Sequence, residues 1–204
     1  MKYILFAFII LCTCFYSNAQ NLTDSLAIDE LCITAEEQEL YDLLMEYRKK
    51  RKLPPIPLSR SLTYVAKIHA MDLHYNRPFR TKKCNMHSWS KSDAWTSCCY
   101  TSDHRRAKYM WNKPDELTEY TSEGYEIAYG YGNRNDYLEH GLITAENALG
   151  GWKSSQGHNY MMINRGEWKK LEWNAIGIAI YKDFALVWFG VEIDEAEVIG
   201  ICDN

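Results

Sequence analysis

Apolar residues recur at helical spacing in the first part of the chain. Thr34 and Glu37 have the spacing of a capping box, and beyond them one face is apolar, at Leu40, Leu43, Leu44 and Tyr47. The proline-rich segment 53–57 cannot continue this helix. The pattern therefore predicts an amphipathic helix that begins at residue 34 and stops before these prolines.

A second helix is predicted to begin at Ser59 or Ser61, either of which can cap it, and to end before Pro78. Five residues of this helix share one face: Leu62, Val65, Ala66, His69 and Leu73. A histidine on an apolar face is more often a hydrogen-bonded core residue than a ligand. We therefore interpret His69 as part of the core and leave it out of the candidate site.

The pattern changes to that of strands near the end of the sequence. Segments 175–181 and 184–192 are apolar and flank Lys182-Asp183, which predicts a hairpin. Both faces of the first strand are apolar, so both should be covered. An earlier strand is predicted over residues 125–131. With helices mostly early and strands mostly late, we expect an α+β fold, an α-β-α sandwich around a small antiparallel sheet.

A third helix is predicted to present a histidine where the chain turns back. Thr144 can cap this helix, which leads into Trp152 and ends in Gly157, with a short turn or helix over residues 159–164. His158 directly follows that glycine. A histidine in this position can face a cleft.

Residues 77–101 show no regular pattern and contain Cys84, Cys98 and Cys99. Loops longer than about 12 to 15 residues are uncommon without a functional or covalent reason. We therefore expect a long loop held by a disulfide, with His87 inside it. Beyond this loop, a short helix is predicted to run to about residue 111, with Asp103 as its cap and Pro114 closing it.

The first 19 residues have the pattern of a secretory signal peptide: Lys2, an apolar run over residues 3–11, and a small-x-small site at Ser17-Asn18-Ala19. Lipidation of Cys12 or Cys14 is a minor alternative. No later segment approaches the roughly 20 apolar residues of a membrane-spanning helix. We expect a soluble protein, secreted to the medium or the periplasm, with a leader over 20–33, one domain over 34–192 and a tail over 193–204.

Charge excludes a general affinity for polyanions. The formal net charge is −4, which gives no overall attraction to nucleic acid or anionic lipid. The single basic run, residues 48–52, stands at the end of the first helix. We interpret it as a complement to the helix dipole.

Cysteine spacing indicates two disulfides. Cys12 and Cys14 leave with the signal peptide, so five of the seven cysteines remain in an oxidising compartment. Cys32 and Cys202 lie near the two ends of the mature chain, and chain ends are often close in space. A bridge between them leaves Cys84 to pair with Cys98 or Cys99.

Three segments carry candidate chemistry. His87, Glu126 and His158 supply two imidazoles and a carboxylate, which together make either a metal site or an acid/base cluster. The sequence contains neither Gly-x-Ser-x-Gly nor His-Glu-x-x-His. Aromatic residues that could line a cleft for lipid, sugar or peptide are Trp89, Trp95, Trp111, Trp152, Tyr125, Tyr129 and Tyr131. Of the tryptophans, Trp152 and Trp188 are expected in the core.

The order of the motifs resembles the CAP superfamily of cysteine-rich secretory, antigen-five and pathogenesis-related proteins, in a form similar to secreted bacterial members. The resemblance covers roughly residues 40–191. The motifs are, in order, Glu39-Leu-Tyr-Asp-Leu-Leu, Leu58-Ser-Arg-Ser-Leu, His87-Ser-Trp, Gly124-Tyr-Glu-Ile, Trp152-Lys-Ser-Ser-Gln-Gly-His and Val187-Trp-Phe-Gly. Each motif is loose alone, but the combination and order are specific.

The resemblance implies an α-β-α sandwich with a cleft lined by two histidines and two acidic residues, occupied in some members by a divalent cation such as zinc. His87 and His158 match the two histidines and Glu126 the glutamate of a Gly-Glu-Asn-type motif, although Ile127 stands where asparagine is usual. Ser155 occupies the position of the other glutamate in many members, for which Glu146 is a candidate substitute.

These observations favour a secreted binding or interaction module without conventional enzymatic turnover. Its ligand would be an apolar molecule, a cell-envelope component or a partner protein. The alternative is a metal-dependent hydrolase such as a peptidase, for which the two histidines and Glu126 could supply ligands and a base. A purely structural envelope protein is a third reading.

Overall fold

The computed structural model describes residues 22–23, 25–81, 83–133 and 136–203. The predicted signal peptide, with Cys12 and Cys14, lies outside these residues. No described helix has the length and apolarity that crossing a bilayer requires.

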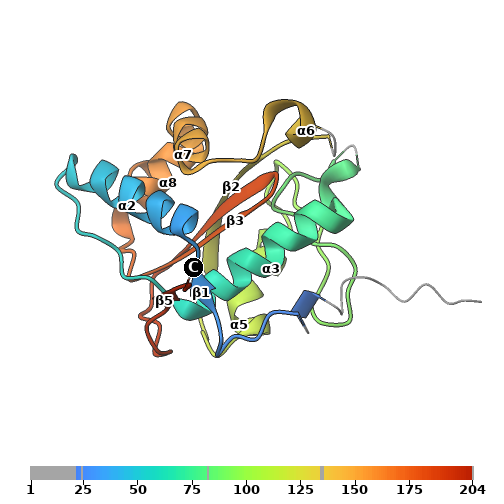
Figure 1. Ribbon diagram of the computed structural model, residues 1–204, viewed down its shortest axis with the longest axis horizontal. Coiled ribbons are helices and arrows are strands. Elements are labelled where there is room, and N and C mark those ends of the chain that lie inside the picture. The colour runs from blue at the N-terminus through green and yellow to red at the C-terminus, as the bar shows by residue number, and fades with distance from the viewer. Residues whose placement is uncertain (1–21, 24, 82, 134–135, 204) are drawn as a thin grey trace, which may run out of the picture.

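The central sheet has three antiparallel strands in the order β2-β4-β3. These are β2 (Gly124–Gly130), β3 (Ala175–Tyr181) and β4 (Phe184–Gly190). Helix α3 (Arg60–Asn76) packs on one face, and α2 (Ala35–Lys49), α7 (Ala145–Ser154) and α8 (Gln156–Met162) lie on the other (Figure 1). The predicted α+β sandwich, with its hairpin and its sheet covered on both faces, is confirmed.

The two faces of β3 differ in side-chain size, and this sets how closely each helical layer packs. Ala175, Gly177 and Ala179 alternate with the isoleucines that face α2 and α7. A Cβ atom on Gly177 would lie 2.0 Å from the backbone carbon of Leu62 in α3. The small-residue face therefore lets the α3 backbone approach the sheet directly, which brings residues of α3 within reach of β2.

The helix caps follow the sequence pattern at three places. The Thr34 hydroxyl accepts from the Glu37 N–H at 3.2 Å, and the Glu37 carboxylate accepts from the Thr34 N–H at 2.7 Å. Ser59 rather than Ser61 caps α3. Thr144 caps α7 as predicted. Each cap satisfies backbone donors that the first turn of a helix leaves open.

The helix that leads into Trp152 was predicted wrongly at its end. It breaks at Ser155, where the backbone is extended, and α8 then begins. Gly157 therefore lies inside α8, and His158 lies on that helix rather than in a turn. A further pair of elements was not predicted: α6 (Asp136–His140) and the 3-10 helix η2 (Gly166–Lys170).

The described residues of the long loop, 81 and 83–106, form no helix between η1 (Pro78–Arg80) and α4 (Ala107–Trp111). A disulfide joins Cys84 to Cys99, which resolves the open choice, and Cys98 is a buried free thiol. Asp103 does not cap α4. Its carboxylate accepts instead from the Thr101 hydroxyl at 2.5 Å, inside the loop. This local turn satisfies Asp103 four residues before the helix starts.

The predicted end of α4 near residue 111 is confirmed, but Pro114 does not close that helix: it lies in the first turn of α5 (Lys113–Leu117). Proline is tolerated there because the first-turn N–H has no acceptor within the helix. The loop and α4 build one wall of the cleft described below.

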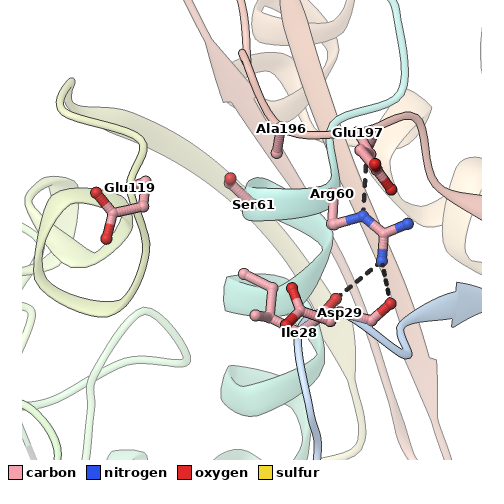
Figure 2. Close-up of a pocket in the computed structure, with 7 residues that line it drawn as sticks. All are labelled: Ile28, Asp29, Arg60, Ser61, Glu119, Ala196 and Glu197. Carbon is pink, nitrogen blue, oxygen red and sulfur yellow. Dashed lines mark hydrogen bonds between the residues drawn. The ribbon is translucent and has the colours of Figure 1, made fainter.

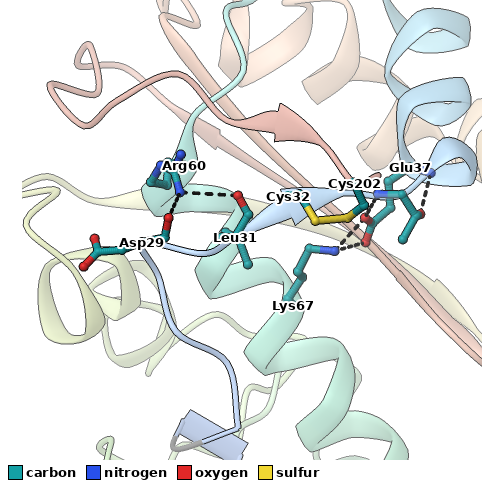
Figure 3. The surroundings of a disulfide bond; sticks show 8 residues. Asp29, Leu31, Cys32, Glu37, Arg60, Lys67 and Cys202 are labelled. Atoms are coloured by element: carbon teal, nitrogen blue, oxygen red, sulfur yellow. Dashed lines mark hydrogen bonds and ion pairs between the residues drawn. A yellow bond between two sulfur atoms is a disulfide. The ribbon is translucent and has the colours of Figure 1, made fainter. Parts of the chain in front are cut away.

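The two ends of the described chain are joined to each other. A disulfide links Cys32 to Cys202, and β1 (Cys32–Ile33) pairs in parallel with β5 (Gly200–Ile201) (Figure 3). Beside this bridge, Lys67 of α3 binds the buried Glu37 of α2 at 2.6 Å (Figure 3). The segments expected as leader and tail are thus bound to the domain.

Arg60 strengthens this closure. Its guanidinium donates to the carbonyl oxygens of Ile28 and Asp29 and, at 3.1 Å, to that of Glu197 (Figure 2). These bonds cross a surface hollow of about 410 Å³. Because the Arg60 N–H groups donate to backbone carbonyl oxygens, we interpret this hollow as part of the contact between the two end segments of the domain and not as a ligand site.

Candidate functional site

A cleft of about 700 Å³ opens between the long loop, α4, β2, α8 and η2. Its walls are mainly aromatic and apolar, formed by Tyr100, Trp111, Tyr125, Met161, Trp168 and Leu171. The ring of Tyr125 contacts those of Trp111 and Trp168. Its centroid lies 5.4 Å from that of Trp111 and 5.1 Å from that of Trp168. These three rings form a continuous aromatic wall.

The structure brings His87, Glu126 and His158 together in this cleft. The two imidazole rings are edge to face, with centroids 6.3 Å apart. Glu146, the candidate fourth residue, is elsewhere: it is exposed in the first turn of α7, where its carboxylate interacts with Glu39 of α2. The expectation that Glu146 is the fourth cleft residue is therefore wrong. Glu146 lies about two turns away from the end of α7 that approaches the cleft.

Glu126 is buried on the face of the sheet that α3 covers, and both of its oxygens are engaged. Oε2 lies 2.5 Å from Nδ1 of His69, and Oε1 lies 2.7 Å from Nδ1 of His87. One carboxylate thus connects a core histidine of α3 with a cleft histidine of the loop.

His69 carries a positive charge in this arrangement. Its Nε2 faces the carbonyl oxygen of Ser88 at 3.0 Å, and a carbonyl can only accept, so Nε2 holds a proton. Its Nδ1 faces the Glu126 carboxylate and donates as well. The ring also stacks on Trp89, with centroids 4.2 Å apart and planes 9° apart, which favours a cation.

The pKa directions agree with a buried ion pair. Burial alone would raise the pKa of Glu126, but His69 and then His87 outweigh it and hold that pKa at about 2. Burial would lower the pKa of His69, yet the Glu126 carboxylate shifts the net pKa upward. Attraction between the two groups exceeds the desolvation of each.

His158 is in a different state. Burial, and then the neighbouring His87, lower the pKa of His158 to about 4. No described side chain is hydrogen-bonded to this imidazole. At neutral pH the ring is therefore uncharged and presents a free donor and a free acceptor.

The predicted zinc ligands do not match a three-ligand zinc site. Catalytic zinc takes three protein ligands and structural zinc four. Both oxygens of Glu126 accept hydrogen bonds from imidazoles, which leaves His87 and His158 of the three predicted residues to face an ion. His104 and Glu167 also line the cleft, and Nδ1 of His104 lies 2.8 Å from the Tyr100 hydroxyl. Over the described ranges, no group of three or more His, Cys, Asp or Glu side chains is placed to hold a metal ion. Glu126 has instead the position of a carboxylate that orients a histidine.

Several aromatic assignments need correction. Trp111 and Tyr125 line the cleft as expected, while Trp89, Trp95 and Trp152 are buried in the core. Tyr129 and Tyr131 pack on the other side of β2 from α3. The core positions predicted for Trp152 and Trp188 are confirmed, since both are fully buried.

Sequence reasoning missed the role of His69 in the site. It is a hydrogen-bonded core residue, as predicted, but its partner is the cleft carboxylate. The available signal was the position itself, because a buried polar side chain needs a partner. Tyr100 and Trp168 were also missed, since the loop and η2 show no periodicity from which to place them.

No protein-family model matches the chain, and no curated protein matches it. Three similar solved structures share its fold to a limited extent. An outer surface protein from Borrelia burgdorferi has 19% identity and a TM-score of 0.49, with 76% of this chain and 91% of that chain covered.

The other two are an extracellular protein containing an SCP domain from Bacillus anthracis and a cysteine-rich secretory protein from Staphylococcus aureus. Their identities are 16% and 14%, and their TM-scores are 0.49 and 0.44. Each match covers 77% of this chain but only 40% and 38% of the longer chains. The solved structures similar to this chain thus include an SCP-domain protein and a cysteine-rich secretory protein, the kinds of protein that its motifs resemble.

Proposed function

We propose that this chain is a secreted CAP-type binding module whose cleft takes up an apolar or aromatic ligand. The order of the sequence motifs supports the CAP assignment. The signal-peptide pattern and the two disulfides support secretion, because disulfides persist in oxidising compartments.

The observation that carries the proposal is the composition of the cleft. Its volume of about 700 Å³ falls in the range of small-molecule sites, roughly 300–1,000 Å³, which are mostly apolar with a few placed polar groups. Trp111, Tyr125 and Trp168 supply the apolar wall, and His87 and His158 supply the polar end. A ligand with an apolar body and one hydrogen-bonding group matches both.

Binding is favoured over hydrolysis by what surrounds the two imidazoles. No hydroxyl or thiol of the described residues is hydrogen-bonded to the ring of His87 or His158, so neither has a nucleophile in place. A metal-dependent hydrolase would need a bound ion to activate water, and no group of three or more His, Cys, Asp or Glu side chains among the described residues is placed to hold one. The hydrolase is therefore the second candidate.

A fluorescent fatty acid, cis-parinaric acid, tests the binding function. We expect it to bind the purified protein and to quench tryptophan emission, and Trp111→Ala to weaken binding. The matched control is Tyr109→Ala on the same short helix, because Tyr109 is 52% exposed and outside the cleft.

Equal affinity in wild type and both variants would reject the cleft as the binding site. The hydrolase is tested separately by incubating the protein with zinc and a broad set of peptide and ester substrates. Turnover that disappears in His87→Ala would overturn the binding-module proposal in favour of the hydrolase.

A further inference from the structure

A second hollow, apart from the cleft, lies where the end of α2 meets the segment between α8 and η2. Its volume is about 540 Å³. Three of its lining side chains are cationic, Arg51, Arg165 and Lys169, and none is a carboxylate. This local excess of positive charge stands out in a chain whose formal net charge is −4.

Arg48 adds a fourth charge directly behind this hollow. Its side chain is buried, with 2% exposed, and donates to Met162 O at 2.6 Å, to Asn164 Oδ1 at 2.8 Å and to Pro54 O at 3.1 Å. All three acceptors are neutral, and the described part of the chain places no carboxylate within ion-pair distance of Arg48. Burying an unpaired charge is costly, so a nearby anion would be stabilising.

The sequence analysis interpreted this basic run as a complement to the helix dipole. The Arg48 guanidinium instead donates to Met162 O, at the end of α8, and to Asn164 Oδ1, two residues beyond it. Asn164 is shared by the two features, since it accepts from Arg48 and lines the hollow. The buried charge is thus coupled to the hollow by one side chain.

One lining cation, Arg51, has its side chain held in place, and a second, Arg165, has its backbone held. The Arg51 guanidinium lies 3.6 Å from the Tyr47 ring centroid and donates to Tyr47 O at 3.0 Å. Arg165 stands between Asn164 and Gly166, which both have positive φ, and its N–H donates to Tyr160 O at 2.9 Å. The fixed Arg51 guanidinium therefore loses less conformational entropy when it binds a ligand.

We propose that this hollow binds an anionic group of phosphate type carried by a partly apolar molecule. The guanidinium groups of Arg51 and Arg165 suit paired hydrogen bonds to phosphate oxygens, and Lys169 adds a point charge. Leu53, Tyr160 and Ile163 supply an apolar side for the rest of the ligand. The source is either a soluble phosphate ester or the headgroup of an anionic phospholipid. The proposal does not depend on the cleft.

The test compares wild type with the double variant Arg165→Gln, Lys169→Gln. Both side chains are exposed, so the fold should be kept. The matched control is Arg106→Gln, Lys108→Gln, which removes one arginine and one lysine from exposed positions outside this hollow. Calorimetry is run with inorganic phosphate and with glycerol phosphate, and co-sedimentation is run with vesicles of equal parts phosphatidylcholine and phosphatidylglycerol.

We expect wild type and control to bind at least one probe, and the double variant to bind about tenfold or more weakly, because each charge-assisted hydrogen bond contributes roughly that factor. Binding of glycerol phosphate alone supports a soluble ester, and binding of vesicles supports a lipid headgroup. Absence of binding to every probe in wild type, or equal binding in wild type and the double variant, would overturn the proposal.

Thermal melts give a second readout. Phosphate stabilises many proteins by exclusion from their surface, and that effect should be equal in all three proteins. A specific site adds stabilisation by mass action. We therefore expect a larger phosphate-dependent rise in Tm for wild type and control than for the double variant. The same rise in all three would contradict a specific site.

Discussion

Nδ1 of His69 lies 2.5 Å from Oε2 of Glu126, and both side chains are buried. The same carboxylate holds His87 at 2.7 Å through its other oxygen. The orientation of a cleft imidazole therefore depends on a helix residue that does not line the cleft. The three side chains form one polar unit between α3, β2 and the long loop.

Glu126→Gln tests that unit. The substitution removes the charge that balances the buried His69 imidazolium, and breaking a buried pair in this way typically costs about 3–5 kcal/mol of the free energy of unfolding. Urea denaturation at neutral pH measures the loss. The exposed control Glu119→Gln should stay within about 0.5 kcal/mol of wild type.

The double variant His69→Gln, Glu126→Gln separates charge imbalance from packing. It leaves no unpaired charge, so it should be more stable than the sum of the two single losses predicts. Strict additivity of the two single variants would contradict the ion pair.

The caps and apolar faces allowed most of the sandwich to be predicted. Thr34, Ser59 and Thr144 begin helices because their side chains satisfy backbone donors within three residues, a purely local effect. The alternation along β3 was equally local. Pro114 misled the prediction because proline is found both just after helices and in their first turn, and its place in the first turn of α5 is not marked by any local pattern.

The site was predictable in its members but not in its connections. His87, Glu126 and His158 were found from the motif order, and they do share one cleft. The bond from Glu126 to His69 joins residues 57 positions apart, through the close approach of α3 that Gly177 permits. No local pattern carries that information, so Glu126 was expected to face an ion rather than two imidazoles.

The Cys84–Cys99 disulfide should hold the loop that carries His87. In the chain-entropy model, closing a loop of 15 residues contributes about 3 kcal/mol to stability. Replacing both cysteines by serine should cost about that amount and should reduce ligand binding in the cleft. Mass mapping of non-reduced peptides checks the pairing. A peptide that links Cys84 to Cys98 would contradict it, and rapid alkylation of Cys98 in the folded protein would contradict the burial of that thiol.

Acid should weaken the contact between the C-terminal segment and α3. Burial alone would raise the pKa of Asp194, but the Ser59 hydroxyl, the Ser61 N–H and other donors lower it overall. A group with a depressed folded pKa contributes stability above its unfolded value near 3.8, and the contribution is lost as pH falls through the folded value.

Asp194→Asn should therefore lower stability at neutral pH and flatten its decline in acid. Denaturation curves between neutral pH and pH values below 3.8 compare the variant with wild type. If both proteins lose stability with the same slope across the acidic range, Asp194 does not contribute through its charge.

Zinc should bind weakly, because the described residues place no group of three or more His, Cys, Asp or Glu side chains to hold it, and the Glu126 oxygens are engaged. His158→Ala removes one of the paired imidazoles of His87 and His158 and should remove measurable binding without unfolding the domain. Trp152→Ala, by contrast, should cost roughly 3–5 kcal/mol of stability, since Trp152 is fully buried. Calorimetry with zinc and parallel thermal melts separate the two effects. Zinc binding of equal strength in wild type and His158→Ala would reject these imidazoles as ligands.

A crystal structure of the protein with bound cis-parinaric acid tests the proposed function most directly. The account predicts the apolar chain along Trp111, Tyr125 and Trp168, with the carboxylate directed at His87 and His158. The Glu126 contacts to His69 and His87 should be unchanged, because they support the cleft rather than contact the ligand. A fatty acid bound outside this cleft, with the aromatic wall free of ligand, would contradict the account.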